Sequence, residues 1–212
     1  MNKPLFICLE GLDGSGKTTQ AKLLSESLQG VYTREPSDLP IGKLIRHYLQ
    51  KLEIDIGHHS FQLMYAADRG EHVKKEILDN LKINKSVVTD RYFFSSIAFG
   101  VAMGLDFDWL NQINRYFPLP DFCFYLDTPI DLCLKRINIR IGNQTRELFE
   151  KKEILRKVAD SYQKIIENYE KIASIHPNLS QGSKLYKING NQTMEKINQD
   201  ILEIININHV QF

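Results

Sequence analysis

The fold of this chain is decided by the stretch Leu5-Phe6-Ile7-Cys8-Leu9-Glu10-Gly11-Leu12-Asp13-Gly14-Ser15-Gly16-Lys17-Thr18. Its first five residues are an apolar run that predicts a buried strand, and Lys17–Gln29 has the apolar spacing of a helix. Between them, Gly11–Thr18 matches the pattern GxxxxGK[ST] in its strand–loop–helix setting. In such a P-loop, the backbone N–H groups of Gly11–Gly16 surround phosphate oxygens. The alternative, an ordinary glycine-rich turn, does not account for this setting, so we expect nucleoside triphosphate binding.

Two side chains of this motif and one carboxylate further along suggest a magnesium–phosphate site. Lys17 is expected to reach the β- and γ-phosphates, and Thr18 to offer its hydroxyl to Mg²⁺. Asp90 follows the apolar stretch Ser86–Thr89, so it can lie at the end of a neighbouring strand and hold the water shell of the same ion. Asp90 could instead only cap a helix.

Length and composition limit the remaining possibilities. The 212 residues fit one domain, and 42% hydrophobic with 25% charged residues is typical of a globular protein. A net charge of +1 argues against a duplex-DNA-binding protein and against a polybasic membrane-surface protein. The three scattered cysteines favour a reducing compartment, and no apolar run is long enough to span a membrane. We therefore expect a cytoplasmic protein that binds neither nucleic acid nor membranes.

Short apolar runs alternate with helix-period stretches along the chain. This alternation predicts an α/β fold, a single domain over residues 1–212 with a parallel sheet flanked by helices. Five strands are expected, at Leu5–Leu9, Val31–Thr33, Ser86–Thr89, Phe122–Leu126 and Leu185–Ile188. Helices are expected from Ile41, at Asp108–Phe117, from Ile130, as one long helix from Ile154 to Ile172, and at Thr193–Ile207. A short mobile lid is expected at about residues 136–148, where Arg140 and Arg146 flank a polar tip.

A second motif narrows the chemistry. Asp90-Arg91-Tyr92-Phe93-Phe94-Ser95-Ser96-Ile97-Ala98-Phe99 places a guanidinium beside the phosphate site, where its planar fork suits a second phosphate. In this block the chain resembles the thymidylate kinases, P-loop enzymes that transfer the ATP γ-phosphoryl group to dTMP. Further blocks in the family's order extend the resemblance over nearly the whole chain: Glu10–Thr19, Thr33-Arg34-Glu35-Pro36, Pro40-Ile41-Gly42 and Tyr65-Ala66-Ala67-Asp68-Arg69-Gly70-Glu71-His72.

The resemblance implies roles for individual residues and a five-stranded sheet. Arg46 and Arg91 would clamp the dTMP phosphate, and Asp13 would lie near the sugar 3′-hydroxyl and the metal. Tyr65 would stack on thymine, Arg69 would bond its carbonyl edge, Ser95 and Ser96 would meet the base, and Phe99 would lie against the sugar 2′ carbon. The resemblance also implies Mg²⁺ with ATP, a cis bond before Pro36 and a homodimer. Where many bacterial members have Gln this chain has Gly100, which leaves base reading to Arg69 and the serines.

The catalytic cation is expected in the lid. Gly14 follows Asp13, so the P-loop has no basic side chain before Lys17. The γ-phosphoryl group needs further cations, and Arg140 or Arg146 is predicted to supply one. Arg136 is expected only to support the base of the lid.

Two other functions remain open at this stage. A deoxynucleoside kinase would need a carboxylate base and would have less use for two phosphate-clamping arginines. A non-catalytic P-loop switch would bind ATP without transferring phosphate. A GTPase is disfavoured because no Asn-Lys-x-Asp stretch is present.

Overall fold

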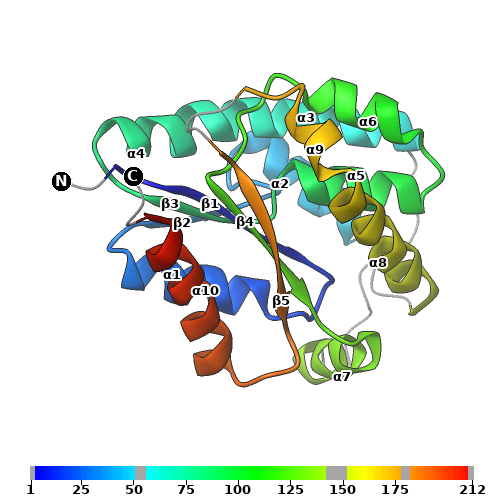
Figure 1. The fold of residues 1–212 in the computed structure, drawn as a ribbon. Coiled ribbons are helices and arrows are strands. Elements are labelled where there is room, and N and C mark those ends of the chain that lie inside the picture. Colours follow the sequence, from blue (N-terminus) through cyan, green and yellow to red (C-terminus); the bar gives the residue numbers. More distant parts are fainter. Residues whose placement is uncertain (1–2, 51–55, 142–151, 178–181, 210–212) are drawn as a thin grey trace.

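Five parallel strands form the centre of the molecule (Figure 1). The computed structural model describes residues 3–50, 56–141, 152–177 and 182–209. The sheet has the order β2-β3-β1-β4-β5, and its strands are β1 (Phe6–Gly11), β2 (Val31–Arg34), β3 (Val87–Asp90), β4 (Phe122–Asp127) and β5 (Lys184–Asn189). The predicted α/β fold with a five-stranded parallel sheet is thus confirmed.

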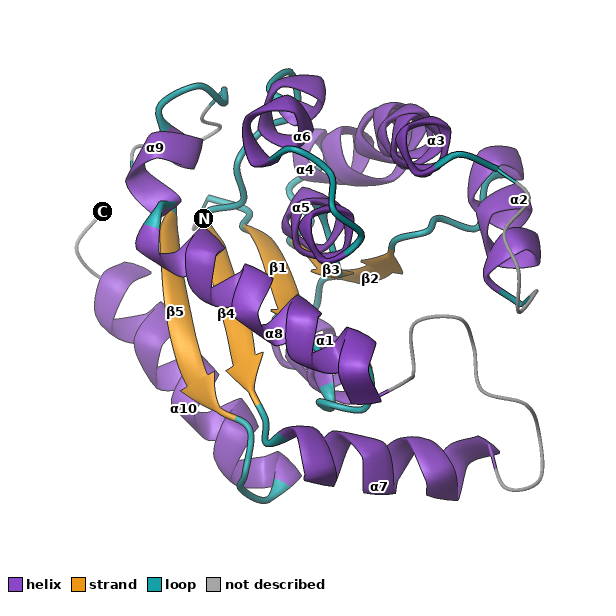
Figure 2. Cartoon of the chain, turned by 90° about the vertical axis from the view of Figure 1, so that its right-hand side faces the viewer, coloured by secondary structure: helices purple, strands orange, loops and turns teal. Residues whose placement is uncertain are grey.

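Helices cover both faces of this sheet (Figures 1 and 2). They are α1 (Lys17–Ser27), α2 (Pro40–Leu49), α3 (His58–His72), α4 (Asp79–Lys82), α5 (Phe93–Ala102), α6 (Phe107–Asn114), α7 (Ile130–Ile141), α8 (Lys152–Glu167), α9 (Tyr169–Ala173) and α10 (Met194–His209), with the π-helix η1 (Val73–Leu78) between α3 and α4. No helix in these described ranges combines the length and apolar character needed to cross a bilayer.

The apolar run of β1 is continuous because each face of the sheet has its own core. Phe6 and Cys8 pack in a buried cluster with residues of α5 and α8, whereas Ile7 and Leu9 pack in a second cluster with residues of α1 and α10. Successive side chains of a strand point to opposite faces, so a strand buried on both faces needs apolar residues throughout.

The strand register gathers charged residues at one edge of the sheet. Leu9 of β1 pairs with Asp90 of β3, and Arg34 of β2 pairs with the same residue. The carboxyl ends of these three strands therefore meet where the P-loop leaves β1, which is where open α/β sheets bind their ligands.

Two helix predictions were wrong in their extent. The single helix expected from Ile154 to Ile172 is two helices, because α8 ends at Glu167 and Asn168 leaves helical geometry with φ −108° and ψ 16° before α9 begins. The apolar stripe nonetheless stays buried on both sides of the break, from Leu155 to Ile172. The helix expected to reach Phe117 ends at Asn114 instead.

Candidate active site

A cavity of about 510 Å³ lies beside the P-loop at this edge of the sheet. Residues of the P-loop, α2, α3, α5 and α7 line it, and its charge is strongly unbalanced. Seven lining residues are cationic, namely Lys17, Arg34, Arg46, Arg69, Arg91, Arg136 and Arg140, whereas three are carboxylates, namely Asp13, Glu35 and Asp90. Such an excess of cations suits ligands that carry several phosphate charges.

The P-loop fits closely against α7. Gly14 has φ 79°, and a Cβ atom added to it would lie 2.4 Å from the backbone oxygen of Cys133. No side chain can stand at position 14 without moving α7. Lys17 follows this turn, and its Nζ donates to the carbonyl of Leu12 at 3.0 Å and lies 3.6 Å from Asp13. Burial and the nearby Arg91 lower the pKa of Lys17.

Thr18 and Asp90 meet across the start of α1. The Thr18 hydroxyl donates to Oδ2 of Asp90, while Oδ1 of Asp90 is buried without a hydrogen-bond partner. An unpartnered carboxylate oxygen beside a hydroxyl offers the hard oxygen ligands that Mg²⁺ prefers. The described residues contain no cluster of three or more His, Cys, Asp or Glu that could hold a metal by itself.

Arg91 shares the Asp13 carboxylate with Lys17 and is fixed by several contacts. Its Nη2 lies 2.5 Å from Oδ1 of Asp13, and its Nη1 donates to the Gly11 carbonyl at 3.1 Å and to Ser95 Oγ at 2.8 Å. The Phe99 ring lies 5.2 Å from the guanidinium carbon. Burial by itself would lower the pKa of Arg91, but Asp13 raises it. Burial would raise the pKa of Asp13, but Arg91 and Lys17 lower it to about 2.

Glu10 and Tyr162 hold this region from behind and were missed as site residues in the sequence. The Glu10 carboxylate accepts from the Tyr92 backbone N–H at 2.8 Å, from Ser95 Oγ at 2.6 Å and from the Tyr162 hydroxyl at 2.7 Å. Burial raises the pKa of Glu10. A charged residue at the end of an apolar strand was a signal for Glu10, whereas nothing local marks Tyr162.

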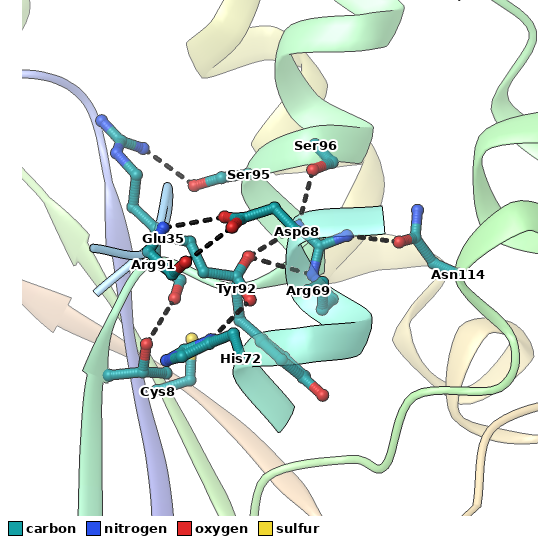
Figure 3. A network of polar contacts seen from close by, with 12 residues as sticks. Cys8, Glu35, Asp68, Arg69, His72, Arg91, Tyr92, Ser95, Ser96 and Asn114 are labelled. Carbon is teal, nitrogen blue, oxygen red and sulfur yellow. Dashed lines mark hydrogen bonds and ion pairs between the residues drawn. The ribbon is translucent and has the colours of Figure 1, made fainter. Parts of the chain in front are cut away.

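The other end of the cavity is built on a buried ion-pair network centred on Arg69 (Figure 3). Glu35 Oε2 accepts from Nε of Arg69 at 2.9 Å and from its Nη2 at 2.7 Å, and Nη2 also donates to Ser96 at 2.8 Å. Asn114 accepts from Nη1 at 2.5 Å, and Oε1 of Glu35 lies 3.0 Å from Nδ1 of His72. Burial would raise the pKa of Glu35, but Arg69 and His72 lower it.

This network limits what Arg69 can offer a ligand. Arginine has five N–H donors, and the four bonds above engage four of them. Only 1% of the Arg69 side chain is exposed. Arg69, the residue predicted to read the base, is therefore mainly a buried structural residue that holds this wall of the cavity together.

The predicted stacking residue and the second predicted clamp lie at the same end. Tyr65 lines the cavity, half-buried, with its ring 5.2 Å from that of Phe61. Arg46 donates to the Pro36 carbonyl at 2.5 Å and to Asp38 at 2.8 Å. The bond between Glu35 and Pro36 is cis.

Helix α7 brings two arginines to the P-loop side. Arg136 donates to the backbone oxygen of Ser15 at 3.1 Å, so it contacts the P-loop itself. Arg140 also lines the cavity. Arg146, the other predicted lid arginine, lies outside the described residues.

Gly100 lies where many bacterial members of the family that the sequence resembles have Gln. At this position, a Cβ would lie 2.7 Å from both methyl groups of Leu110, which explains why this buried position has no side chain.

Most of the predicted site residues thus converge on one cavity. The P-loop, Thr18 and Asp90 lie at one end, the residues of α2 and α3 lie at the other, and Arg91 and Phe99 line the same cavity. A cavity that has a P-loop at one end and further cationic residues at the other is typical of a nucleotide-binding phosphotransferase of the P-loop class.

Comparison with known proteins gives the particular family. Residues 9–183 match the family model described as thymidylate kinase. The chain is 41% identical to a probable thymidylate kinase of Pyrococcus horikoshii, over 94% of this chain and 95% of the relative. It is 45% identical to a probable thymidylate kinase of Methanococcus aeolicus, over 78% of this chain and 80% of that one.

A solved structure agrees with this assignment. The thymidylate kinase of Candida albicans superimposes with a TM-score of 0.81 at 25% identity, covering 98% of this chain and 93% of that chain. The chain belongs to the thymidylate kinase family. The sequence-based expectation of a dTMP kinase is confirmed at this level.

Proposed function

We propose that this chain transfers the γ-phosphoryl group of ATP to dTMP inside the cavity described above, giving ADP and dTDP. The observation that carries the proposal is the single cavity that joins the P-loop to an aromatic and cationic pocket on α2, α3 and α5. ATP phosphates would lie on the P-loop with Lys17, and the dTMP phosphate would lie between Arg46 and Arg91.

The reaction needs positioning and charge neutralisation more than acid–base chemistry. An oxygen of the dTMP phosphate forms the new bond to the γ-phosphorus as the bond to the ADP oxygen breaks. The attacking oxygen is already anionic, so no residue has to remove a proton from it. Lys17 and Arg91 reduce the repulsion between the two anions, and Arg140 or Arg146 adds positive charge when ATP is bound.

Mg²⁺ fits the oxygens of Thr18 and Asp90. The unpartnered Oδ1 of Asp90 and the Thr18 hydroxyl would hold it with waters and ATP oxygens, as is usual for this ion. When bound, Mg²⁺ would neutralise charge on the phosphates. Asp13 would lie between this site and the sugar 3′-hydroxyl, held there by Arg91.

The acceptor base and sugar would contact the remaining wall. Tyr65 would stack on thymine, and Phe99 would exclude a ribose 2′-hydroxyl because its ring already packs on Arg91. Arg69 would offer its one remaining N–H to a base carbonyl, with Ser95 and Ser96 beside it.

One assay separates this function from the two alternatives. ADP formation from Mg·ATP is measured with dTMP, with thymidine, with dUMP and without acceptor. We expect turnover with dTMP far above that with thymidine, because two arginines are matched to an acceptor phosphate. Preference for thymidine would indicate a nucleoside kinase, and acceptor-independent slow hydrolysis would indicate a switch.

The assembly and location follow the family expectation. We propose a cytoplasmic homodimer formed through α2 and α3, which pack together and leave Leu44 and Leu63 exposed by 47% and 51%. The domain is proposed to be single over residues 1–212, with the lid at about 136–148.

A further inference from the structure

Gln62 is a buried polar residue of the acceptor pocket that none of the roles above uses. It lies on α3 and lines the same cavity as Tyr65 and Arg69. Only 5% of the residue is exposed, and its Oε1 is buried without a hydrogen-bond partner. A buried carbonyl oxygen without a partner costs about 1–3 kcal/mol, so this acceptor needs an explanation.

Its position on α3 places it with the acceptor-site residues. Residues 62, 65 and 69 are spaced i, i+3 and i+7, so Gln62, Tyr65 and Arg69 share one face of the helix. That face is the one that lines the cavity. An amide on the same face as the stacking ring can meet the edge of a base that lies on the ring.

The Arg69–Glu35 pair leaves one requirement of thymine unmet. Thymine presents N3–H, a donor, between two carbonyl oxygens, and arginine can only donate. Glu35 already accepts from Arg69 and from His72, so its carboxylate is committed within the protein. Gln62 lines the cavity, and its buried Oε1 is an acceptor without a hydrogen-bond partner.

We propose that Gln62 is a base-specificity residue, whose amide oxygen accepts from N3–H of the thymine of dTMP. This inference rests on the placement of dTMP in the α3 end of the cavity proposed above. With Arg69 donating to a thymine carbonyl beside it, the pair reads thymine and rejects cytosine. Cytosine presents an acceptor at N3 and an amino group at N4, so both contacts would be mismatched.

The test compares three acceptors in wild type and in Gln62→Met, which keeps the volume and removes the acceptor. The acceptors are dTMP, dCMP and N3-methyl-dTMP, and kcat/KM is measured for each at saturating Mg·ATP. We expect kcat/KM for dTMP to fall about tenfold, the value of one lost hydrogen bond, while the KM for ATP stays the same. The preference for dTMP over dCMP and over N3-methyl-dTMP should narrow by a similar factor.

A matched control comes from Gln20, a second buried glutamine with an unpartnered Oε1, which lies outside this cavity. Its Nε2 donates to the Met194 carbonyl at 2.8 Å. Gln20→Met should therefore lower the melting temperature and leave the base preference unchanged. Gln62→Met loses no hydrogen bond within the described protein, so its melting temperature should not fall. If it does, Gln62→Leu provides a second apolar replacement for the same kinetic comparison.

Failure of the Gln62 proposal can be told apart from failure of the proposed function. If wild type does not phosphorylate dTMP, the assignment of the cavity is wrong. If wild type phosphorylates dTMP but treats N3-methyl-dTMP equally well, N3–H is not read and the proposal for Gln62 fails. An unchanged base preference in both Gln62 variants overturns it as well.

Discussion

Arg91 stands where it does because other parts of the chain hold it there. Its φ of 73° lies in the left-handed region, which costs a non-glycine residue about 1–3 kcal/mol. Contacts with Asp13, the Gly11 carbonyl and Ser95 offset this cost. The same contacts hold the guanidinium beside the P-loop residues Gly11 and Asp13.

Lys17 is expected to matter for transfer and not for folding. Its Nζ bonds only to the Leu12 carbonyl and Asp13 among the contacts found within the described residues. Lys17→Ala should lower kcat by at least about 10²–10³-fold, as for other lost electrostatic donors. Steady-state kinetics test this, with circular dichroism as the control. Near wild-type turnover, or loss of helical signal together with activity, would contradict it.

Asp13 is expected to link stability to pH in the acid range. Its folded pKa of about 2 lies below the unfolded value of about 3.9, so the unfolded chain binds this proton first as the pH falls. The stabilisation by ionised Asp13 is complete above about pH 4 and disappears towards about pH 2. Urea unfolding of wild type and Asp13→Asn should show a difference in unfolding free energy that shrinks in this window. A difference that does not depend on pH would mean that the Asp13 charge is not its source.

At the scale of elements, α7 and α8 carry contacts of the C-terminal half into the site. The start of α7 packs on Gly14, and its Arg136 donates to the P-loop carbonyl of Ser15. From α8, Tyr162 reaches Glu10 and Ser95. Both helices therefore help to hold the phosphate site in place, although neither belongs to the P-loop motif.

Arg140 is expected to act on the transferred group. It lines the cavity, and its charge helps to lower the pKa of Asp13. We expect removal of the operative arginine, by Arg140→Ala, Arg146→Ala or the double variant, to lower kcat about 10²–10³-fold. The KM for dTMP should stay almost unchanged, because Arg46 and Arg91 are the residues proposed to hold the acceptor phosphate.

The control on the same helix is Lys135→Ala, which removes an exposed cation that does not line the cavity. A double variant of Arg140 and Arg146 that keeps kcat within a few fold of wild type would show that the missing cation comes from elsewhere.

Tyr162 is expected to be a structural tie between α8 and the end of β1. Tyr162→Phe removes a hydroxyl that donates to Glu10 at 2.7 Å and leaves that buried carboxylate with one bond fewer. We expect unfolding to be easier by about 1–3 kcal/mol, measured by urea denaturation. The exposed Tyr116 offers the same substitution as a control and should change little. Equal stability of Tyr162→Phe and wild type would show that water replaces the bond.

At the scale of the molecule, helices cover both faces of the sheet (Figure 2), but Leu44 of α2 and Leu63 of α3 stay exposed. Leu44→Glu with Leu63→Glu should reduce the mass measured by light scattering from dimer to monomer, since charges at an apolar contact are costly. Ile83→Glu, at an exposed apolar residue beyond α4, should leave the dimer intact. A monomeric wild type would contradict the proposed assembly directly.

Short-range patterns were enough to predict most of the architecture. The alternation of apolar runs and helix-period stretches located all five strands, and the P-loop motif marked the edge of the sheet that holds the cavity. The same patterns failed at Asn168, where the structure breaks the predicted helix into α8 and α9. Because the apolar stripe continues from α8 into α9 and stays buried, the spacing of apolar residues gives no sign of the break.

What the sequence by itself determined is therefore the fold class, the P-loop and the residues that local motifs carry, such as Lys17 and Arg91. The tertiary structure alone decided which partners these residues have. Glu10 and Tyr162 are 152 positions apart, and Arg69 draws Glu35 and Asn114 from separate elements. Such contacts depend on strand order and helix packing, which bring distant segments together without leaving a local pattern. The unpartnered oxygen of Gln62 has the same origin, because only the folded structure shows that this glutamine is buried, lines the cavity and lacks a hydrogen-bond partner for its Oε1.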